Sequence, residues 1–407
     1  MQVRFTHGRP GATDMSTTIT PTKIEKFAVL AFVLLFPGAF FYHVGTGIGY
    51  IPHVLGGYIS FVGAALLSVF LAHSAIATMK DKKVKKYDLH FYAFMLLFGS
   101  ISAISYINGY HVENAQSNFL LFINLLVCFY IFKSINITDE TFKKTVTVST
   151  LLMSATILYL STGGRFSIEL LSETPESVAS YQTFAIAYIC PLALTIGKTK
   201  SRLYRNVFFA LGMICLYLNS ARSEFVGLVI FFLVFEASAS KYRIVTPIVA
   251  IALAAIALVA VASIDPEMAD NRITQLMDLS KDESSNVRDE ISREGFEKIL
   301  ESPVFGDYGN YEPGYYIHNI LSAWQELGIF GFVYFLLLIY SPTKRFAVNA
   351  LIYGDRSRGT ALCLGMLAAT IVLLIFGKYF AYPLVAVALG MASSEFKSRS
   401  AIVRQPA

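Results

Sequence analysis

Residues 359–376 read GTALCLGMLAATIVLLIF, a run without a single charged side chain. A helix that crosses the hydrocarbon core of a bilayer needs about 20 predominantly apolar residues, so this run is close to the length of one crossing. Runs of this kind recur along all 407 residues, of which 55% are hydrophobic and 15% are charged. The composition is far from that of a soluble globular protein and predicts an all-α, polytopic membrane protein.

We predict about twelve transmembrane helices from these runs. They lie near residues 25–44, 54–77, 89–108, 117–133, 146–162, 179–197, 205–219, 224–240, 244–263, 317–340, 359–376 and 379–395. The expected organisation is a tail over 1–24, helices one to nine over 25–263, a large loop with short helices over 264–316, helices ten to twelve over 317–395, and a tail over 396–407.

The basic residues set the expected orientation. Twenty-five of the 33 Lys and Arg residues fall on one side of these predicted helices. The positive-inside rule places that side in the cytoplasm, together with both termini. Arg165, Arg222 and Lys378 lie in short segments on the opposite, outer side, where the rule disfavours them. Basic residues on this side are therefore candidates for a role in binding or catalysis. The alternative is a side chain that snorkels, with its charged group in water, and we favour this alternative for Lys378 and Lys281.

Other features exclude several classes of protein. The net charge of +5 comes from basic residues in short loops, which does not favour nucleic-acid binding. The four cysteines all fall inside apolar runs and have the pattern of small buried hydrophobes. No cleavable signal peptide is evident, and Met15 is a candidate start, because the residues before it have no structural pattern.

The outer loop over 264–316 carries thirteen acidic and five basic residues, which predicts a solvated cap. A helix is expected from about Ser284, and Ser302-Pro303 should end it. Its predicted apolar face consists of Val287, Ile291, Phe296, Ile299 and Leu300. A tyrosine-rich stretch over 306–316 then leads to His318, and these tyrosines could form an interfacial belt or stack on sugars.

His318-Asn319 precedes Gly328-Ile329-Phe330-Gly331, whose glycines should permit a close approach between this helix and a neighbour. Arg222, Arg288 and His318 all fall on the outer side. Two arginines can grip a pyrophosphate through paired, charge-assisted hydrogen bonds. A neutral histidine can accept the proton of an acceptor hydroxyl.

Together these three residues predict glycosyl transfer from a lipid pyrophosphate, with no metal or cofactor. Arg165, Asn319 and Arg293 are additional possible substrate contacts. The alternatives are a structural His318, an Arg222 that pairs with Glu224, and a divalent ion at Asp265-Pro266-Glu267 that bridges carboxylates and pyrophosphate.

Three pieces resemble the O-antigen ligase and polymerase superfamily of bacterial envelope enzymes. They are Ser220-Ala221-Arg222-Ser223 at the end of a span, Arg288 ahead of Ser302-Pro303-Val304-Phe305-Gly306, and His318-Asn319 leading to Gly328-Ile329-Phe330-Gly331. The gap from His318-Asn319 to Gly328 is one residue shorter than usual, which would turn the glycine by about 100° around a helix. Ala221 separates Ser220 from Arg222, where a direct Ser-Arg pair is common.

The resemblance implies an enzyme of the bacterial inner membrane that transfers a glycan from undecaprenyl pyrophosphate on the periplasmic face. It implies that Arg222 and Arg288 engage the pyrophosphate and that His318 is essential. Ligases of this superfamily use lipid A–core as the acceptor, whereas polymerases extend a chain of repeat units. The single dominant loop before His318 favours the ligase type, with the polymerase as the alternative.

A transporter for lipid-linked sugars is the alternative from another class, since twelve spans with both ends inside is a common carrier layout. The predicted spans show no internal repeat of the kind typical of transporters. We expect almost no ionisable residue inside them, apart from His73 and from Lys378 near a helix end. Both observations disfavour a coupled transport pathway.

Overall fold

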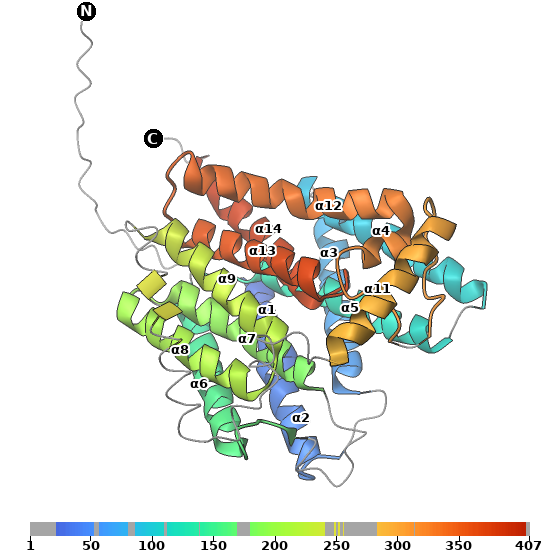
Figure 1. Ribbon diagram of the computed structural model, residues 1–407. Helices are drawn as coiled ribbons and strands as arrows, with labels where there is room; N and C mark the ends of the chain where they lie inside the picture. Colours follow the sequence, from blue (N-terminus) through green and yellow to red (C-terminus); the bar gives the residue numbers. More distant parts are fainter. Residues whose placement is uncertain are drawn as a thin grey trace, which may run out of the picture.

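The computed structural model describes residues 22–52, 57–79, 86–109, 112–137, 139–168, 180–240, 283–312 and 314–403, with five further positions between 248 and 255. Within these ranges the regular elements are helices, and a lone bridge joins Thr162 to Arg165. The helices are α1 (Lys23–Val33), η1 (Leu34–Gly38), α2 (Ala39–Gly47), α3 (Tyr58–Met79), α4 (Lys86–Ile107), α5 (Val112–Ser134), α6 (Glu140–Leu160), α7 (Tyr181–Lys198), α8 (Arg202–Leu218), α9 (Arg222–Ala239), α11 (Glu283–Glu301), α12 (Ser322–Leu351), α13 (Arg358–Phe376) and α14 (Pro383–Val403) (Figure 1).

The all-α prediction is confirmed in the described part of the chain. Six helical segments are long and apolar enough to cross a membrane by length and composition. They are Lys23–Gly47, Tyr58–Ile76, Tyr87–Ile107, Ser117–Ser134, Ser322–Leu351 and Arg358–Phe376. Eleven of the twelve predicted runs coincide with helices, and the ninth, over 244–263, falls almost entirely outside the described residues. The number of spans and the periplasmic loop stay predictions.

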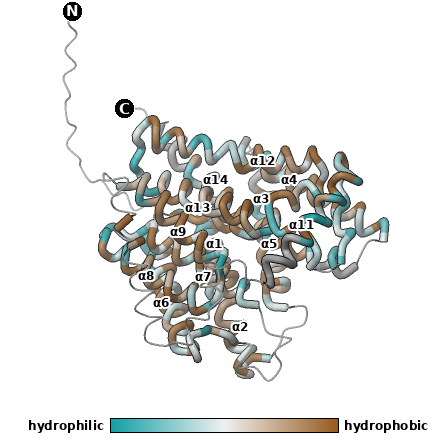
Figure 2. The backbone as a smooth tube through the Cα atoms, viewed as in Figure 1, coloured by the Kyte–Doolittle hydropathy of each residue, from teal (hydrophilic) through white to brown (hydrophobic). Residues whose placement is uncertain are grey.

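The helices pack into one bundle (Figure 1). Within it, α13 packs extensively on α9, α14 packs on α5, and α11 lies against α12. Figure 2 shows apolar residues along most of the bundle and hydrophilic residues over much of α11. Large apolar side chains also point outwards, and Phe61 and Leu96 are 67% and 73% exposed. An outer surface rich in such side chains is compatible with a membrane environment.

Two helix boundaries differ from the sequence prediction. The run over 317–340 becomes a helix that begins at Ser322 and continues to Leu351, so His318 lies in the preceding turn. The run over 379–395 becomes a helix that begins at Pro383, and residues 377–382 form a loop. Proline favours the first turn of a helix because it has no N–H to leave unsatisfied there. Both differences move polar residues out of predicted spans and into loops.

Several ionisable residues pair with one another near the ends of these helices. The Lys133 ammonium lies 2.7 Å from the Asp88 carboxylate, and Arg205 binds Glu236 with two nitrogens at 2.5 and 3.1 Å. Each of these four residues lies in the first or last turn of its helix. A hydropathy pattern does not reveal charged residues near helix ends, because the apolar run between the two ends remains uninterrupted.

The helix predicted in the outer loop is confirmed as α11, which ends at Glu301, next to Ser302-Pro303. Its apolar face was predicted correctly in part. Ile291 and Ile299 are buried, whereas Phe296 and Leu300 are 46% and 65% exposed. The side chain of Val287 lies outside the described residues. The buried face of α11 is therefore narrower than the sequence pattern indicated.

Candidate functional site

The loop between α11 and α12 is anchored on the ends of α4 and α5. The Ser105 hydroxyl donates to the carbonyl of Tyr308 at 2.5 Å. The Asn114 carboxamide donates to the carbonyls of Gly309 and Tyr311, at 3.1 and 2.5 Å. These hydrogen bonds satisfy three carbonyls in an irregular segment, where an unpaired buried carbonyl would be costly. The loop that leads to His318 therefore has a defined position.

A close backbone contact holds the other side of this loop at a break within α12. Gly328 has φ 65° and ψ −177°, and a Cβ there would lie 2.1 Å from the carbonyl oxygen of Val304. The N–H of Ile329 donates to the carbonyl of Pro303 at 3.0 Å. The predicted close approach at Gly328 is confirmed, but its partner is the preceding loop and not another helix. Because Gly328 is non-helical, the shorter gap after His318 does not translate into a rotation around a helix.

His318 lies in a turn that Asn319 stabilises. The Asn319 side-chain oxygen accepts from the N–H of Leu321 at 2.8 Å. The Ser322 hydroxyl donates to the Asn319 carbonyl at 2.7 Å and accepts from the N–H of Phe380 at 3.0 Å. Ser322 therefore ties the turn to the α13–α14 loop. Asn319, predicted as a possible substrate contact, has a local structural role in this arrangement.

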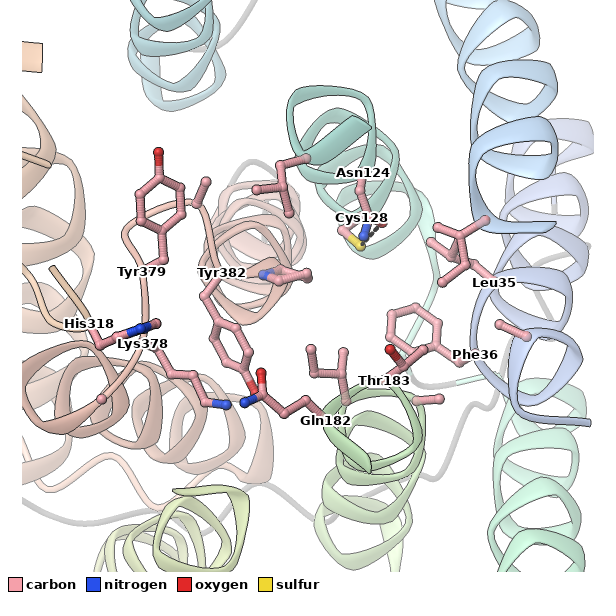
Figure 3. Close-up of a pocket in the computed structure, with 18 of the residues that line it drawn as sticks. Leu35, Phe36, Asn124, Cys128, Gln182, Thr183, His318, Lys378, Tyr379 and Tyr382 are labelled. Atoms are coloured by element: carbon pink, nitrogen blue, oxygen red, sulfur yellow. Dashed lines mark hydrogen bonds between the residues drawn. The ribbon is translucent and has the colours of Figure 1, made fainter. Parts of the chain in front are cut away.

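His318 and the α13–α14 loop border a cavity of about 300 Å³ (Figure 3). One part of its wall is polar and is formed by Gln182, Thr183, His318, Lys378, Tyr379 and Tyr382. Another part is apolar and is formed by Leu35, Phe36, Ile59, Leu121, Ile186 and Ala187. A cavity with both kinds of wall suits a ligand that joins a polar or charged head to an apolar chain.

The apolar wall includes a π-helical turn, η1. Pro37 lies inside this segment and has no N–H to donate. The Tyr58 hydroxyl donates to the carbonyl of Leu34 at 3.0 Å, which holds the start of α3 against the turn. Single π-turns often occur at functional sites because they redirect neighbouring side chains. Here the turn carries Leu35 and Phe36 at the cavity wall.

Lys378 is the residue whose role the sequence missed. Its side chain is 6% exposed, and its Nζ lies 2.7 Å from Glu224 Oε1. The Tyr382 hydroxyl donates to the same oxygen at 2.8 Å, and Lys378 Nζ lies 5.1 Å from the Tyr382 ring centroid. The snorkelling interpretation of Lys378 is therefore wrong, and Glu224 pairs with Lys378 in place of Arg222. The position of Lys378 on the predicted outer side was the one sequence signal for this pair.

Aromatic side chains connect His318 to the rest of the polar wall. The Tyr316 ring lies 4.5 Å from the His318 ring and 4.7 Å from the Tyr379 ring, measured between centroids. Burial, and then the charge of Glu326, raise the pKa of Tyr379 well above its usual value. The Tyr379 hydroxyl therefore stays protonated at neutral pH and can donate a hydrogen bond.

Two tyrosines of the preceding loop are too buried to belong to an interfacial belt. Tyr308 and Tyr311 are 3% and 5% exposed and pack inside the protein, whereas Tyr315 is 49% exposed. Glu326 is fully buried beneath this loop, and its Oε2 accepts from the N–H of Gly309 at 3.0 Å. Tyr308 and Tyr311 therefore help to anchor the loop, whereas Tyr316 borders the cavity.

The two candidate arginines nearest this region lie beside the α8–α9 turn. Arg222 is the first residue of α9, two positions before Glu224. The N–H of Phe166 donates to the carbonyl of Leu218 at 2.8 Å, which places the Arg165 segment against the end of α8. Arg165 is exposed and Arg222 is half-buried. Neither side chain borders the cavity, although both belong to elements next to it.

The two candidate arginines on α11 are less defined. Arg293 is exposed on that helix. Arg288 falls within α11, but its side chain lies outside the described residues, as do Asp265 and Glu267 of the metal alternative. In the described ranges no group of three or more His, Cys, Asp or Glu side chains is placed to hold a metal ion. Of the predicted site residues with described side chains, His318 is the one that borders the cavity.

The cavity can therefore offer three groups to a ligand: a buried ammonium, an imidazole beside aromatic rings, and an apolar surface. All four cysteines are buried, as the sequence predicted. No family model matches this chain, and no curated protein sequence matches it.

Proposed function

We propose that this protein is a membrane glycosyltransferase that moves a glycan from undecaprenyl pyrophosphate to an acceptor sugar hydroxyl. The reaction would take place at the periplasmic face of the bacterial inner membrane, with both termini in the cytoplasm. The observation that supports this proposal most is the cavity that brings His318 and Lys378 next to an apolar wall. An isoprenoid pyrophosphate carries a charged group, which suits the polar wall of the cavity, and an apolar chain, which suits the apolar wall.

In the proposed reaction His318 accepts the proton of the acceptor hydroxyl while that oxygen attacks the anomeric carbon of the donor glycan. The bond from this carbon to the pyrophosphate oxygen breaks, and undecaprenyl pyrophosphate leaves with the electron pair. Single displacement inverts the configuration at this carbon. Arg222 and Arg288 would stabilise the charge that grows on the leaving group, which lowers the barrier more than it stabilises the ground state. The proposal assigns no metal and no cofactor to this step.

The ligase type, with lipid A–core as the acceptor, is the version that we favour, because the sequence predicts one large loop before His318. A repeat-unit polymerase of the same superfamily would use the same donor and the same histidine. The two versions differ in the product that accumulates when the protein is absent. A ligase deficiency leaves full-length glycan on undecaprenyl pyrophosphate, whereas a polymerase deficiency leaves lipopolysaccharide capped by a single repeat unit.

The test is complementation of a strain that lacks this protein, with wild type and a His318→Ala variant expressed to equal levels. Lipopolysaccharide is separated on a gel beside an extract of undecaprenyl-linked glycan. Wild type is expected to restore long-chain lipopolysaccharide, and His318→Ala is expected to fail. His73, which is exposed on α3 away from the cavity, offers a matched control, and His73→Ala should complement fully.

Each outcome has a clear meaning. If His318→Ala complements as well as His73→Ala, the histidine is structural and the proposed reaction is wrong. If the deficient strain accumulates neither product, glycan transfer is not the function of this protein. Accumulation of unflipped lipid-linked glycan on the cytoplasmic face would instead support the transporter alternative.

A further inference from the structure

The Lys378 ammonium has more hydrogen-bonding capacity than its protein partners use. A lysine ammonium carries three N–H donors. In the part of the chain that the structure describes, Glu224 is the acceptor for this ammonium, and the face of the Tyr382 ring lies 5.1 Å from Nζ. Two donors therefore have no acceptor among the described residues, although Lys378 is only 5% exposed. A buried cation with unused donors at a cavity wall points to an anionic or strongly accepting ligand.

The surroundings of Lys378 fix the position of this charge. Figure 3 shows its side chain extending along the cavity toward Gln182, with the Tyr382 ring beside it. Glu224 belongs to α9, whereas Lys378 and Tyr382 belong to the α13–α14 loop, so the ion pair locks two elements together. A flexible lysine side chain loses much of its conformational freedom in such a pair before any ligand arrives. Glu224 is thus a positioning residue for the ammonium.

The apolar wall continues from this charge. Residues Leu35, Phe36 and Ile186 border the same cavity as Lys378. A free inorganic anion would use the ammonium alone, whereas a phosphate attached to an isoprenyl chain would use both walls. An isoprenyl chain would cover these apolar side chains, which a soluble anion would leave uncovered. The combination favours a lipid phosphate over a soluble one.

We infer that Lys378, held by Glu224 and Tyr382, binds the phosphate that carries the isoprenyl chain of the donor. This inference rests on the proposed function and adds a third cation to Arg222 and Arg288, which would engage the sugar-bearing side of the pyrophosphate. Lys378 then sets how deeply the donor enters and where its anomeric carbon lies relative to His318.

The experiment measures binding by purified full-length protein in lipid nanodiscs. The ligands are farnesyl pyrophosphate, farnesol and inorganic pyrophosphate, and affinity is determined by ligand-dependent shifts in thermal unfolding. Wild type is expected to bind farnesyl pyrophosphate more tightly than either of the other two. Lys378→Gln is expected to weaken farnesyl pyrophosphate at least tenfold and to leave farnesol unchanged, and Lys378→Arg should recover most of the loss.

Lys133→Gln is the matched control, because Lys133 also forms a 2.7 Å ion pair between helices, with Asp88, but at the opposite end of α5 from the anchored loop. It should change thermal stability without changing the preference for farnesyl pyrophosphate over farnesol. If Lys378→Gln cannot be purified, the double variant Lys378→Met with Glu224→Leu replaces the pair by apolar groups of similar size, which often preserves folding. It should show the same selective loss of pyrophosphate affinity.

The possible failures are distinct. Equal farnesyl pyrophosphate affinity in wild type and Lys378→Gln overturns the role of Lys378 and leaves the proposed transfer reaction standing. Inorganic pyrophosphate that binds wild type as tightly as farnesyl pyrophosphate makes the cavity a soluble-anion site and overturns the inference. Absence of farnesyl pyrophosphate binding by wild type removes the donor assignment, and the proposed function fails with it.

Discussion

Replacement of Gly328 by alanine should destabilise the protein through the docking of the loop that leads to His318. The backbone of Gly328, at φ 65° and ψ −177°, occupies a region that L-residues avoid. Holding alanine there costs about 1–3 kcal/mol. The new Cβ would also lie 2.1 Å from the carbonyl oxygen of Val304, so the loop must shift. Relief of such overpacking costs about 1–3 kcal/mol, which brings the expected loss of unfolding free energy to about 2–6 kcal/mol.

A variant at Gly354 separates the cost of the backbone conformation from the cost of the steric contact. It has φ +68°, close to that of Gly328, but a Cβ there would meet nothing within 4 Å. Gly354→Ala should therefore cost about 1–2 kcal/mol, the backbone contribution alone. Both variants would be unfolded by titration with SDS in mixed micelles, and hydrogen exchange of residues 303–312 would be followed in the native state. Exchange in this segment should rise in Gly328→Ala and stay at the wild-type level in Gly354→Ala.

The comparison can fail in a definite way. If Gly328→Ala is no more destabilised than Gly354→Ala, the contact between Gly328 and Val304 does not hold the loop. If it is destabilised but hydrogen exchange over 303–312 is unchanged, the cost lies in α12 itself. Either result would refute the view that the glycine serves to dock this loop.

Three further predictions concern other contacts. Arg205→Met should cost about 3–5 kcal/mol of unfolding free energy because it leaves the Glu236 carboxylate buried and unpaired, and Arg205→Met with Glu236→Leu should recover most of that loss in the same SDS titration. Asn114→Ala removes two hydrogen bonds to loop carbonyls, should cost about 1–3 kcal/mol, and should raise hydrogen exchange over 308–312; unchanged exchange would contradict the anchoring role. Arg222→Ala and Arg288→Ala should each lower glycan transfer in membranes by about 100-fold or more without loss of folded protein, and full activity in either folded variant would remove that arginine from the pyrophosphate site.

The anchoring of the His318 turn shows how far local sequence signals reach. Ser302-Pro303 marked the end of α11 correctly, because proline disfavours helical backbone in the residue before it. The glycines at 328 and 331 also indicated a close approach by another part of the protein. The sequence could not indicate that Val304 would be the partner, because the pattern of glycines is the same for a neighbouring helix and for a folded-back loop.

The hydropathy pattern alone predicted a helical protein and the positions of most of its helices. The length of an apolar run is a local property of the sequence, and a helix needs about 20 apolar residues to cross a bilayer. Local signals also located His318 next to a helix start. The pairing of Glu224 with Lys378, and the burial of Glu326, were decided by tertiary structure. A charge near a helix end looks the same in sequence whether it faces water or a partner on a distant element. Which of these occurs depends on the helices that pack beside it, and that packing is a property of the whole fold.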